Sequence, residues 1–222
     1  MSSLIDACAE WEEQQRSKRI SQSDGDFKIT HINVYDLEES IIASGLPMRT
    51  AYDEYVFESQ TFGLTFNADN AHFKRACDLA SNPTGSGHNN FLSGIIVSMN
   101  ITATVKWWEQ FQRYHFKQIV SSMSTMHRLR KMALEGTLQF NSLTNPDIVK
   151  DFVRLAKDET VTDEELAYAC PMGLMLTARV TTNYLQLRTQ YQQRKHHKLK
   201  EWHDYCRFIE NLPYAKEFIV GE

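Results

Sequence analysis

The sequence predicts one α+β domain with more helix than strand. Residues 27–35 and 91–101 alternate apolar and polar side chains, as half-buried strands do. Most segments after residue 104 instead carry apolar residues at helical spacing. With 222 residues, 42% of them hydrophobic and 11% aromatic, the chain can bury one substantial core. These observations argue against a disordered chain.

Two parts of the N-terminal third are irregular or polar. Residues 1–27 read as a polar extension, within which residues 4–19 are expected to be helical. Residues 47–70 are rich in aromatic side chains but follow neither helical nor strand spacing, so this segment can be a loop, an edge strand or a lid. The folded domain is therefore expected to begin at residue 28.

A strand and two short helices are expected before the central segment of the chain. The strand at 27–35 leads into a helix at 36–44, with Asp36 as its N-cap and Gly45 as the residue that ends it. A second helix is expected at 71–80. Turn-forming residues follow it, with the sequence Asn82-Pro83-Thr84-Gly85-Ser86-Gly87.

The central segment predicts a strand and then a helix with a cationic edge. One side of the strand is apolar and consists of Phe91, Ile95, Val97, Met99 and Ile101. The helix is expected over residues 104–120. Residues at i, i+4, i+7 and i+11 of this helix form its polar edge: Lys106, Gln110, Arg113 and Lys117. This edge is the first indication of an anion-binding function.

The rest of the chain is expected to be mainly helical. Residues 120–128 are rich in hydroxyl side chains and can end the preceding helix. Helices are expected at 146–157 and at 162–169. After Pro171-Met172-Gly173, we expect a long helix at 174–195 and an amphipathic helix at 199–211.

Two segments are basic although the chain has a net charge of −4. No acidic residue lies between Glu109 and Glu135, and none lies between Glu165 and Glu201. The lysines and arginines of these segments are Arg113, Lys117, Arg128, Arg130 and Lys131, and then Arg179, Arg188, Arg194, Lys195, Lys198 and Lys200. Two such segments in an acidic protein predict a site for an anion.

Several classes of protein are disfavoured by the sequence. No apolar run approaches the roughly 18 residues of a spanning helix, and the N-terminus lacks a basic start followed by an apolar core. We therefore expect a cytoplasmic protein without a membrane role. Four cysteines are scattered without a C-x-x-C pair, which disfavours a disulfide framework or a zinc site: Cys8, Cys77, Cys170 and Cys206. The adjacent His196 and His197 diverge on a helix, so no metal site is expected.

Three groups of residues are candidates for binding. His88 follows Gly85 and Gly87, and it can contact a ligand there or be a solvent-exposed turn residue. Arg113, close to Gln110 on the predicted helix, can bind a phosphate or a base edge, or be a solvated surface residue. A third group offers hydroxyls and a cation to a nucleotide phosphate, or only ends a helix: Ser121, Ser122, Ser124, Thr125 and Arg128.

Residues 88–113 and 171–202 resemble the flavin-dependent thymidylate synthases. In that family a Gly-His pair precedes a strand and Gln-x-x-Arg follows it, as Gly87-His88 and Gln110 to Arg113 do here. The second block matches the family in the order Pro171, Asn183, Leu187, Arg194 and Glu201-Trp202. Asn183 and Arg194 are three helical turns apart, which puts them on one face of the predicted helix.

The resemblance implies a homotetrameric enzyme that methylates dUMP, or an analogous pyrimidine nucleotide, with FAD, methylenetetrahydrofolate and NADPH. It implies a small, mainly antiparallel sheet with long helices, and residues 28–222 as the catalytic domain. The residues implied to bind FAD are His88, Arg113, His115 and Asn183. Those implied to bind the nucleotide are Gln110, Ser124, Arg128 and Arg194. Arg194 would also be catalytic, because a guanidinium beside the uracil ring favours its N3 anion. No enzyme cysteine is required.

The chain departs from the family pattern at several positions. Arg113-Tyr114-His115 stands in place of Arg-His-Arg, and Ser124 and Arg128 align with the family's Ser and Arg only after a shift. Ala167 replaces an arginine, and Asn183-Tyr184-Leu185 replaces Asn-x-Arg. Two hypotheses follow from the matches and departures. One is a flavin-dependent methyltransferase, and the other is a non-catalytic nucleotide-binding or nucleic-acid-binding protein on the same scaffold.

Overall fold

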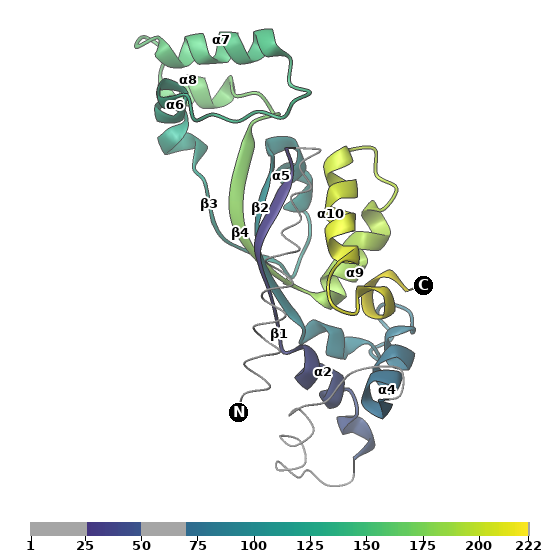
Figure 1. Cartoon of the computed structure of the whole chain (residues 1–222). Coiled ribbons are helices and arrows are strands. Elements are labelled where there is room, and N and C mark those ends of the chain that lie inside the picture. The colour runs from purple at the N-terminus through teal and green to yellow at the C-terminus, as the bar shows by residue number, and fades with distance from the viewer. Residues whose placement is uncertain (1–25, 50–69, 222) are drawn as a thin grey trace, which may run out of the picture.

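A four-stranded antiparallel sheet forms the centre of the protein (Figure 1). The computed structural model describes residues 26–49 and 70–221. The strands are β1 (Lys28–Tyr35), β2 (Ile96–Thr104), β3 (Gln118–Ser122) and β4 (Met175–Asn183), in the order β1-β2-β4-β3. Every neighbouring pair is antiparallel. The predicted α+β class and small antiparallel sheet are therefore confirmed, whereas the expected helix at 4–19 lies outside the described residues.

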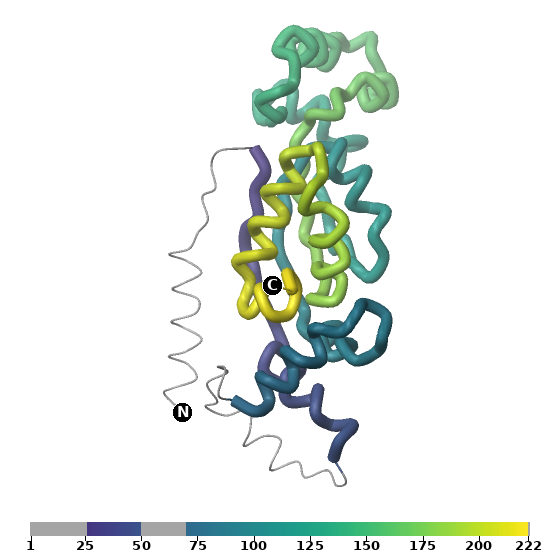
Figure 2. Tube along the Cα trace, turned by 90° about the vertical axis from the view of Figure 1, so that its right-hand side faces the viewer, coloured from purple at the N-terminus to yellow at the C-terminus, as the bar shows by residue number. Residues whose placement is uncertain are grey.

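One face of the sheet is covered by helices and the other is polar. Figures 1 and 2 show α5 (Val105–Phe111), α9 (Tyr184–Arg194) and α10 (Lys200–Glu210) packed on the covered face. The predicted alternation explains this arrangement, because its apolar side is fully buried at Val97, Met99 and Ile101 of β2 and at Ile95 just before the strand. On the opposite face, hydroxyl side chains of β2 and β4 pair with each other, Ser98 with Thr181 at 2.7 Å and Thr102 with Thr177 at 2.8 Å.

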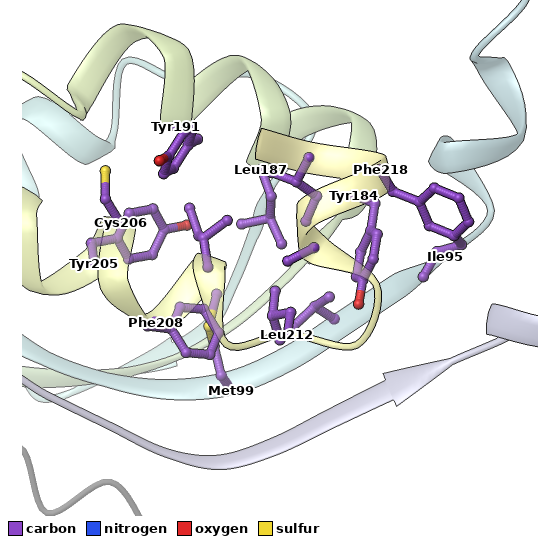
Figure 3. Packing of buried hydrophobic residues seen from close by; sticks show 14 of the residues in the cluster. Ile95, Met99, Tyr184, Leu187, Tyr191, Tyr205, Cys206, Phe208, Leu212 and Phe218 are labelled. Atoms are coloured by element: carbon purple, nitrogen blue, oxygen red, sulfur yellow. The ribbon is translucent and has the colours of Figure 1, made fainter. Parts of the chain in front are cut away.

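The main core lies between β2 and the helices on the covered face. Figure 3 shows Met99 of β2 beside side chains of α9 and α10, including Leu187, Tyr205 and Phe208. A group of aromatic rings fills the space between α5 and α10. The ring centroid of Trp107 lies 4.6 Å from that of Phe111 and 4.8 Å from that of Trp202. Large flat rings fix the relative position of these two helices, which carry the candidate site.

Three helices form a cap at one end of the sheet (Figure 1). They are α6 (Thr125–Glu135), α7 (Pro146–Lys157) and α8 (Asp163–Tyr168), and they bury a small core of their own. Arg130 of α6 links the three helices. Its guanidinium donates to the carbonyl oxygens of Ala156, Asp158 and Val161, and Nε donates to Asp163 at 2.7 Å. The cap follows directly from the C-terminal end of β3.

The opposite end of the sheet carries the remaining helices. These are α2 (Leu37–Ala43), the short η1 (Leu46–Met48), α4 (Ala71–Ala80), η2 (Asn90–Ser93) and the π-helical turn η3 (Lys216–Val220). Asn70 caps α4 with its side-chain oxygen, which accepts from the N–H groups of His72 and Phe73. No helix within residues 26–49 and 70–221 is long and apolar enough to cross a bilayer.

The two long helices predicted from the sequence are wrong. Residues 174–195 form strand β4 followed by α9, and the strand pairs along its whole length with β2. Residues 104–120 form only the short α5, after which the chain turns back and enters β3. In each case a helical pattern was extended across a junction between a helix and a strand. The predicted edge formed by Lys106, Gln110, Arg113 and Lys117 therefore does not exist.

Smaller differences concern the ends of elements. The central strand was expected from residue 91 but begins at Ile96, and residues 90–93 form the short helix η2 instead. Asp36 precedes α2 but makes no side-chain capping bond, and its backbone is left-handed with φ 58°. Residues 120–128 contain the end of β3 and the start of α6, for which Ser124 is the N-cap. The predictions of a strand at 27–35 and helices at 71–80, 146–157, 162–169 and 199–211 are confirmed.

Candidate functional site

Arg194 lies at the centre of a cluster of four side chains that come from three parts of the chain. Its Nε donates to the hydroxyl of Tyr114 at 2.7 Å, and its Nη1 donates to Oε1 of Gln110 at 3.4 Å. The guanidinium lies over the ring of Trp202, 4.4 Å from the ring centroid. Gln110 also accepts from the indole N–H of Trp202 at 2.8 Å. We call Gln110, Tyr114, Arg194 and Trp202 the guanidinium cluster.

The fold brings these residues together through the contact between α5 and α10. Gln110 lies near the end of α5, and Tyr114 follows in the turn after it. Arg194 is the last residue of α9, and Trp202 lies in the first turn of α10. Beside Trp202, the buried Glu201 accepts from the backbone N–H and the hydroxyl of Thr104, which is the N-cap of α5. The starts of α5 and α10 are thereby fixed to each other.

The electrostatics of the cluster keep its neighbours neutral. Burial raises the pKa of Tyr114, and this effect outweighs the hydrogen bond from Arg194, which lowers it. His197 follows Arg194 closely, and burial together with the charge of Arg194 lowers its pKa. At neutral pH the cluster therefore holds a guanidinium cation and a neutral phenol, and the neighbouring imidazole of His197 is neutral. A cation lying on an indole face and held by two acceptors suits an anionic or strongly polarised planar ligand.

Two adjoining clefts lie along β3, the first between α5 and strands β3 and β4, and the second between the end of β3 and α6 of the cap. The first has a volume of about 370 Å³ and is mainly apolar, with Trp108, Met172 and Leu176 in its wall. The second has a volume of about 510 Å³, and its wall includes Ser124, Arg128 and Lys131 together with the acid Glu135 and the apolar side chains of Met123 and Met132. Ser122 and Met123 line both clefts. The second cleft offers hydroxyl groups and the guanidinium of Arg128, and the first offers an indole ring, so together they have groups that can bind a nucleotide.

The structure brings some of the predicted site residues together and separates others. Gln110 and Arg194 share the guanidinium cluster, and Ser124 and Arg128 share the second cleft. No member of the guanidinium cluster lines either cleft. The binding roles implied for these residues remain predictions.

The residues implied to bind FAD lie elsewhere on the surface. His88, Arg113 and His115 are exposed. Asn183 is the N-cap of α9 and accepts from the N–H of Gln186 at 3.0 Å. It therefore lies at the opposite end of α9 from Arg194, and its side-chain oxygen already has one donor.

Tyr114 is the main residue of the cluster that sequence reasoning missed. It lies in the sequence Arg113-Tyr114-His115, which was notable only as a departure from a family pattern. Its hydroxyl accepts from Arg194, 80 residues later, and donates to Oε1 of Gln193 at 3.2 Å. The two basic segments without acidic residues gave one indication of this contact, because Tyr114 lies in the first and Arg194 in the second. Residue spacing alone could not show that the two segments meet in space.

No group of three or more potential metal-ligating His, Cys, Asp or Glu side chains occurs in the described part of the chain. His196 and His197, which are adjacent in the sequence, do not belong to any such group. His197 uses Nδ1 to accept from the backbone N–H of Leu199 at 3.0 Å, so this imidazole has a structural partner in the loop between α9 and α10.

Neither a protein-family model nor a curated protein matches this chain. Solved structures do match. The flavin-dependent thymidylate synthase of Helicobacter pylori, solved with FAD and dUMP, matches in two structures with 16% and 14% identity and TM-scores of 0.59 and 0.57. Each match covers 87% of this chain and 96% of the other. The UMP/dUMP methylase PolB of Streptomyces cacaoi, bound to 5-Br dUMP, matches at 12% identity with a TM-score of 0.58, over 88% of this chain and 94% of that one. The chain therefore has the fold of the flavin-dependent thymidylate synthases.

Proposed function

We propose that this protein is a flavin-dependent methyltransferase acting on dUMP or an analogous pyrimidine nucleotide, with methylenetetrahydrofolate as carbon donor and NADPH as reductant. The observation that carries the proposal is the guanidinium cluster, in which Arg194 is held on the face of Trp202 by Tyr114 and Gln110. The fold supports it, because the structures with this fold were solved with FAD and dUMP or with 5-Br dUMP. The folate and NADPH rest on the sequence resemblance alone.

Arg194 would act on the pyrimidine ring. A guanidinium next to the ring stabilises the deprotonated form of N3, and this raises the electron density at C5, where a methyl group is added. The indole of Trp202 and the amide of Gln110 restrict the motion of the guanidinium before the ligand binds. Restricting the side chain in advance lowers the entropic cost of binding.

The phosphate would bind in the second cleft. Ser124 offers a hydroxyl there and Arg128 offers positive charge, whereas Lys131 is paired with Glu135 in the same cleft. Since the guanidinium cluster does not line this cleft, we propose that one nucleotide contacts Arg194 of one subunit and Ser124 and Arg128 of another. A homotetramer would provide such composite sites.

FAD would supply the redox chemistry when bound, and the donors available in the chain fit it. Gly85 and Gly87 have φ values of 90° and 82°, and an added Cβ at either would meet no atom within 4 Å. The backbone before the exposed His88 is therefore open to close approach by a ligand. Exposed Arg113 and His115 offer a cation and an imidazole for the diphosphate or the ring system. His88, Arg113, His115 and Asn183 are the proposed FAD-binding residues.

We propose residues 28–222 as the catalytic unit, with residues 1–27 as a polar extension. The last residue of that extension, Phe27, is only 5% exposed, and its ring packs 5.4 Å from that of Trp107. A truncation that tests the boundary should therefore keep Asp26 and Phe27. The cytoplasm remains the expected location.

A non-catalytic nucleotide-binding or nucleic-acid-binding protein is the second candidate. It is favoured by His115 and Ala167, each of which stands where the family has an arginine. Affinity for a nucleic acid would fall steeply with salt through counterion release, whereas affinity for a mononucleotide would fall much less. Titrations at two salt concentrations separate the two kinds of ligand.

A turnover assay tests the proposed function. The purified chain would be incubated with FAD, NADPH, methylenetetrahydrofolate and either dUMP or UMP, and the 5-methylated nucleotide would be detected by mass spectrometry. We expect product from the wild type and none from Arg194→Ala. Lys195→Ala, which removes the neighbouring exposed cation, should retain turnover. Product formation by Arg194→Ala at the wild-type rate would contradict the role of Arg194.

A further inference from the structure

The donors of Arg194 are used unequally. Nε is bound to Tyr114 at 2.7 Å and Nη1 is bound to Gln110 at the longer distance of 3.4 Å. Within residues 26–49 and 70–221, Nη2 has no hydrogen-bond partner. One face of the guanidinium is covered by Trp202. A ligand that meets Arg194 therefore finds the two N–H groups of Nη2 and the second N–H of Nη1 as the available donors.

This distribution of donors has a consequence for ligand choice. The Nε–H and Nη2–H groups of an arginine point in parallel and form a fork that matches the two oxygens of a carboxylate or a phosphate. In this protein the phenol oxygen of Tyr114 occupies the Nε–H of that fork. Side-on, two-point binding of a phosphate is thereby blocked, and a single acceptor such as a ring carbonyl or a ring nitrogen anion can still bind at Nη2.

We propose that Tyr114 is a positioning residue that assigns Arg194 to the pyrimidine ring and prevents it from binding the phosphate side-on through Nε and Nη2. This inference rests on the proposed function and deepens it, because it names the residue that selects which part of the nucleotide Arg194 contacts. Tyr114 acts only through Arg194 and does not itself touch the ligand.

The hydrogen bonds of Tyr114 fix the direction of this interaction. The phenol oxygen accepts from Arg194, and the phenol hydrogen is donated to Oε1 of Gln193 at 3.2 Å. The phenol must be neutral to donate this hydrogen. Burial raises the pKa of Tyr114, so the hydroxyl remains protonated at neutral pH. The arrangement of Arg194, Tyr114 and Gln193 is therefore stable where the enzyme would work.

The test separates the ring from the phosphate. Calorimetric titrations in the presence of FAD would measure the affinities of dUMP, deoxyuridine and 2-deoxyribose 5-phosphate for the full-length wild type and for Tyr114→Phe. A hydrogen bond to a charged group is lost in the variant, so we expect affinity for deoxyuridine to fall about 10-fold or more. Affinity for 2-deoxyribose 5-phosphate should be unchanged or higher, because the fork of Arg194 is released.

Three further variants make the test specific. Tyr191→Phe is the matched control, since it removes a tyrosine hydroxyl that donates to Glu210 at 2.8 Å, and it should leave all three affinities unchanged. Tyr114→His offers a ring nitrogen as acceptor for Nε and should restore part of the affinity for deoxyuridine. In Arg194→Lys, which has no Nε–H donor, adding Tyr114→Phe should have no further effect on deoxyuridine affinity.

The possible outcomes distinguish this inference from the proposed function. Suppose that the wild type binds dUMP. The role of Tyr114 is then overturned, and the proposed function left intact, if Tyr114→Phe binds deoxyuridine as tightly as the wild type does. The same holds if Tyr114→Phe loses affinity for deoxyuridine and for 2-deoxyribose 5-phosphate by the same factor. A wild type that binds neither dUMP nor deoxyuridine overturns the proposed function, and the role of Tyr114 with it.

Discussion

The carboxylate of Glu201 accepts both hydrogen-bond donors of Thr104, the backbone N–H at 2.8 Å and the hydroxyl at 2.7 Å. Glu201 is only 5% exposed, and the contact joins the start of α10 to the start of α5. Replacing Glu201 with Ala leaves two donors without an acceptor. We expect the free energy of unfolding, measured with urea, to fall by about 3 kcal/mol.

The matched control for Glu201→Ala is Glu109→Ala. Glu109 belongs to α5 and pairs with Lys106 at 2.8 Å, but both side chains are more than half exposed. An exposed pair of this kind contributes little, so the free energy of unfolding should change by less than about 0.5 kcal/mol. Equal losses in both variants would show that burial of Glu201 does not strengthen its contact.

The pH dependence of the same contact has a definite sign. Burial raises the pKa of Glu201, and the two bonds from Thr104 only partly oppose this. A carboxyl whose pKa is higher in the folded state stabilises the fold most below its unfolded pKa, and this contribution is lost as the pH rises through the folded pKa. The stability of the wild type relative to Glu201→Gln should therefore be higher at about pH 4 than at about pH 7. A difference that grows with pH would contradict the sign.

Two adjacent threonines of β4 should respond in opposite ways to valine. Thr182 is 3% exposed, and its hydroxyl has no hydrogen-bond partner among the residues that the structure describes. Thr182→Val should therefore raise the free energy of unfolding by about 1 kcal/mol. Thr181→Val removes the bond to Ser98 and should lower it by a similar amount. Both values follow from urea titrations, and destabilisation by Thr182→Val would point to a partner for its hydroxyl.

Arg130 should control the stability of the cap separately from the sheet. Its guanidinium satisfies three carbonyl oxygens at the end of α7 and in the loop before α8, and it pairs with Asp163. In Arg130→Met we expect amide hydrogen exchange to accelerate throughout α6, α7 and α8, with local opening easier by about 2 kcal/mol, while β2 and β4 remain protected. Lys131→Met, which removes an exposed pair to Glu135 at 3.6 Å, should change neither region.

Arg128 provides a kinetic test of the phosphate cleft under the proposed function. Its exposed guanidinium lines the second cleft with Ser124. Arg128→Ala should raise the KM for the nucleotide about 10- to 100-fold and leave kcat nearly unchanged, because a remote phosphate contact contributes to binding more than to the chemical step. Arg154→Ala, on the exposed side of α7, is the control and should leave both constants unchanged. An unchanged KM in Arg128→Ala would place the phosphate elsewhere.

The order of elements could be predicted from the sequence where one pattern applied to one element. The alternation of Val97, Met99 and Ile101 located β2, and turn or capping residues marked α4, α7 and α8. The break after α5 could not be predicted, because neither Gly nor Pro marks it. Phe116 instead adopts a φ of 55°, which a bulky residue rarely does. Tertiary contacts hold that turn.

β4 was missed for a different reason. Tyr184, Leu187 and Tyr191 have true helical spacing, and the helix was extended backwards over Val180 and its neighbours. The β-branched residues of that stretch favour a strand, but strand propensity depends strongly on the neighbouring strands. Only pairing with β2 and β3 on its two sides decides the structure of this segment.

The candidate site was predicted only in part, because its residues are far apart in the sequence and meet only in the folded chain. Gln110 and Arg194 were identified by resemblance, and they do share one cluster. The bond from Arg194 to Tyr114 depends on how α5 packs against α9 and α10, so no local pattern could have indicated it. A departure from a family motif marked the position of Tyr114 without revealing its partner.

Retention of FAD is the most direct test of whether this protein is a flavin-dependent enzyme. The purified full-length chain would be incubated with FAD, desalted and examined by absorbance, and dUMP would then be added. A flavin-dependent methyltransferase should be yellow after desalting, with a flavin spectrum that differs from that of free FAD and shifts again with dUMP. A colourless protein, with all the FAD recovered in the small-molecule fraction, would contradict a flavin-dependent function.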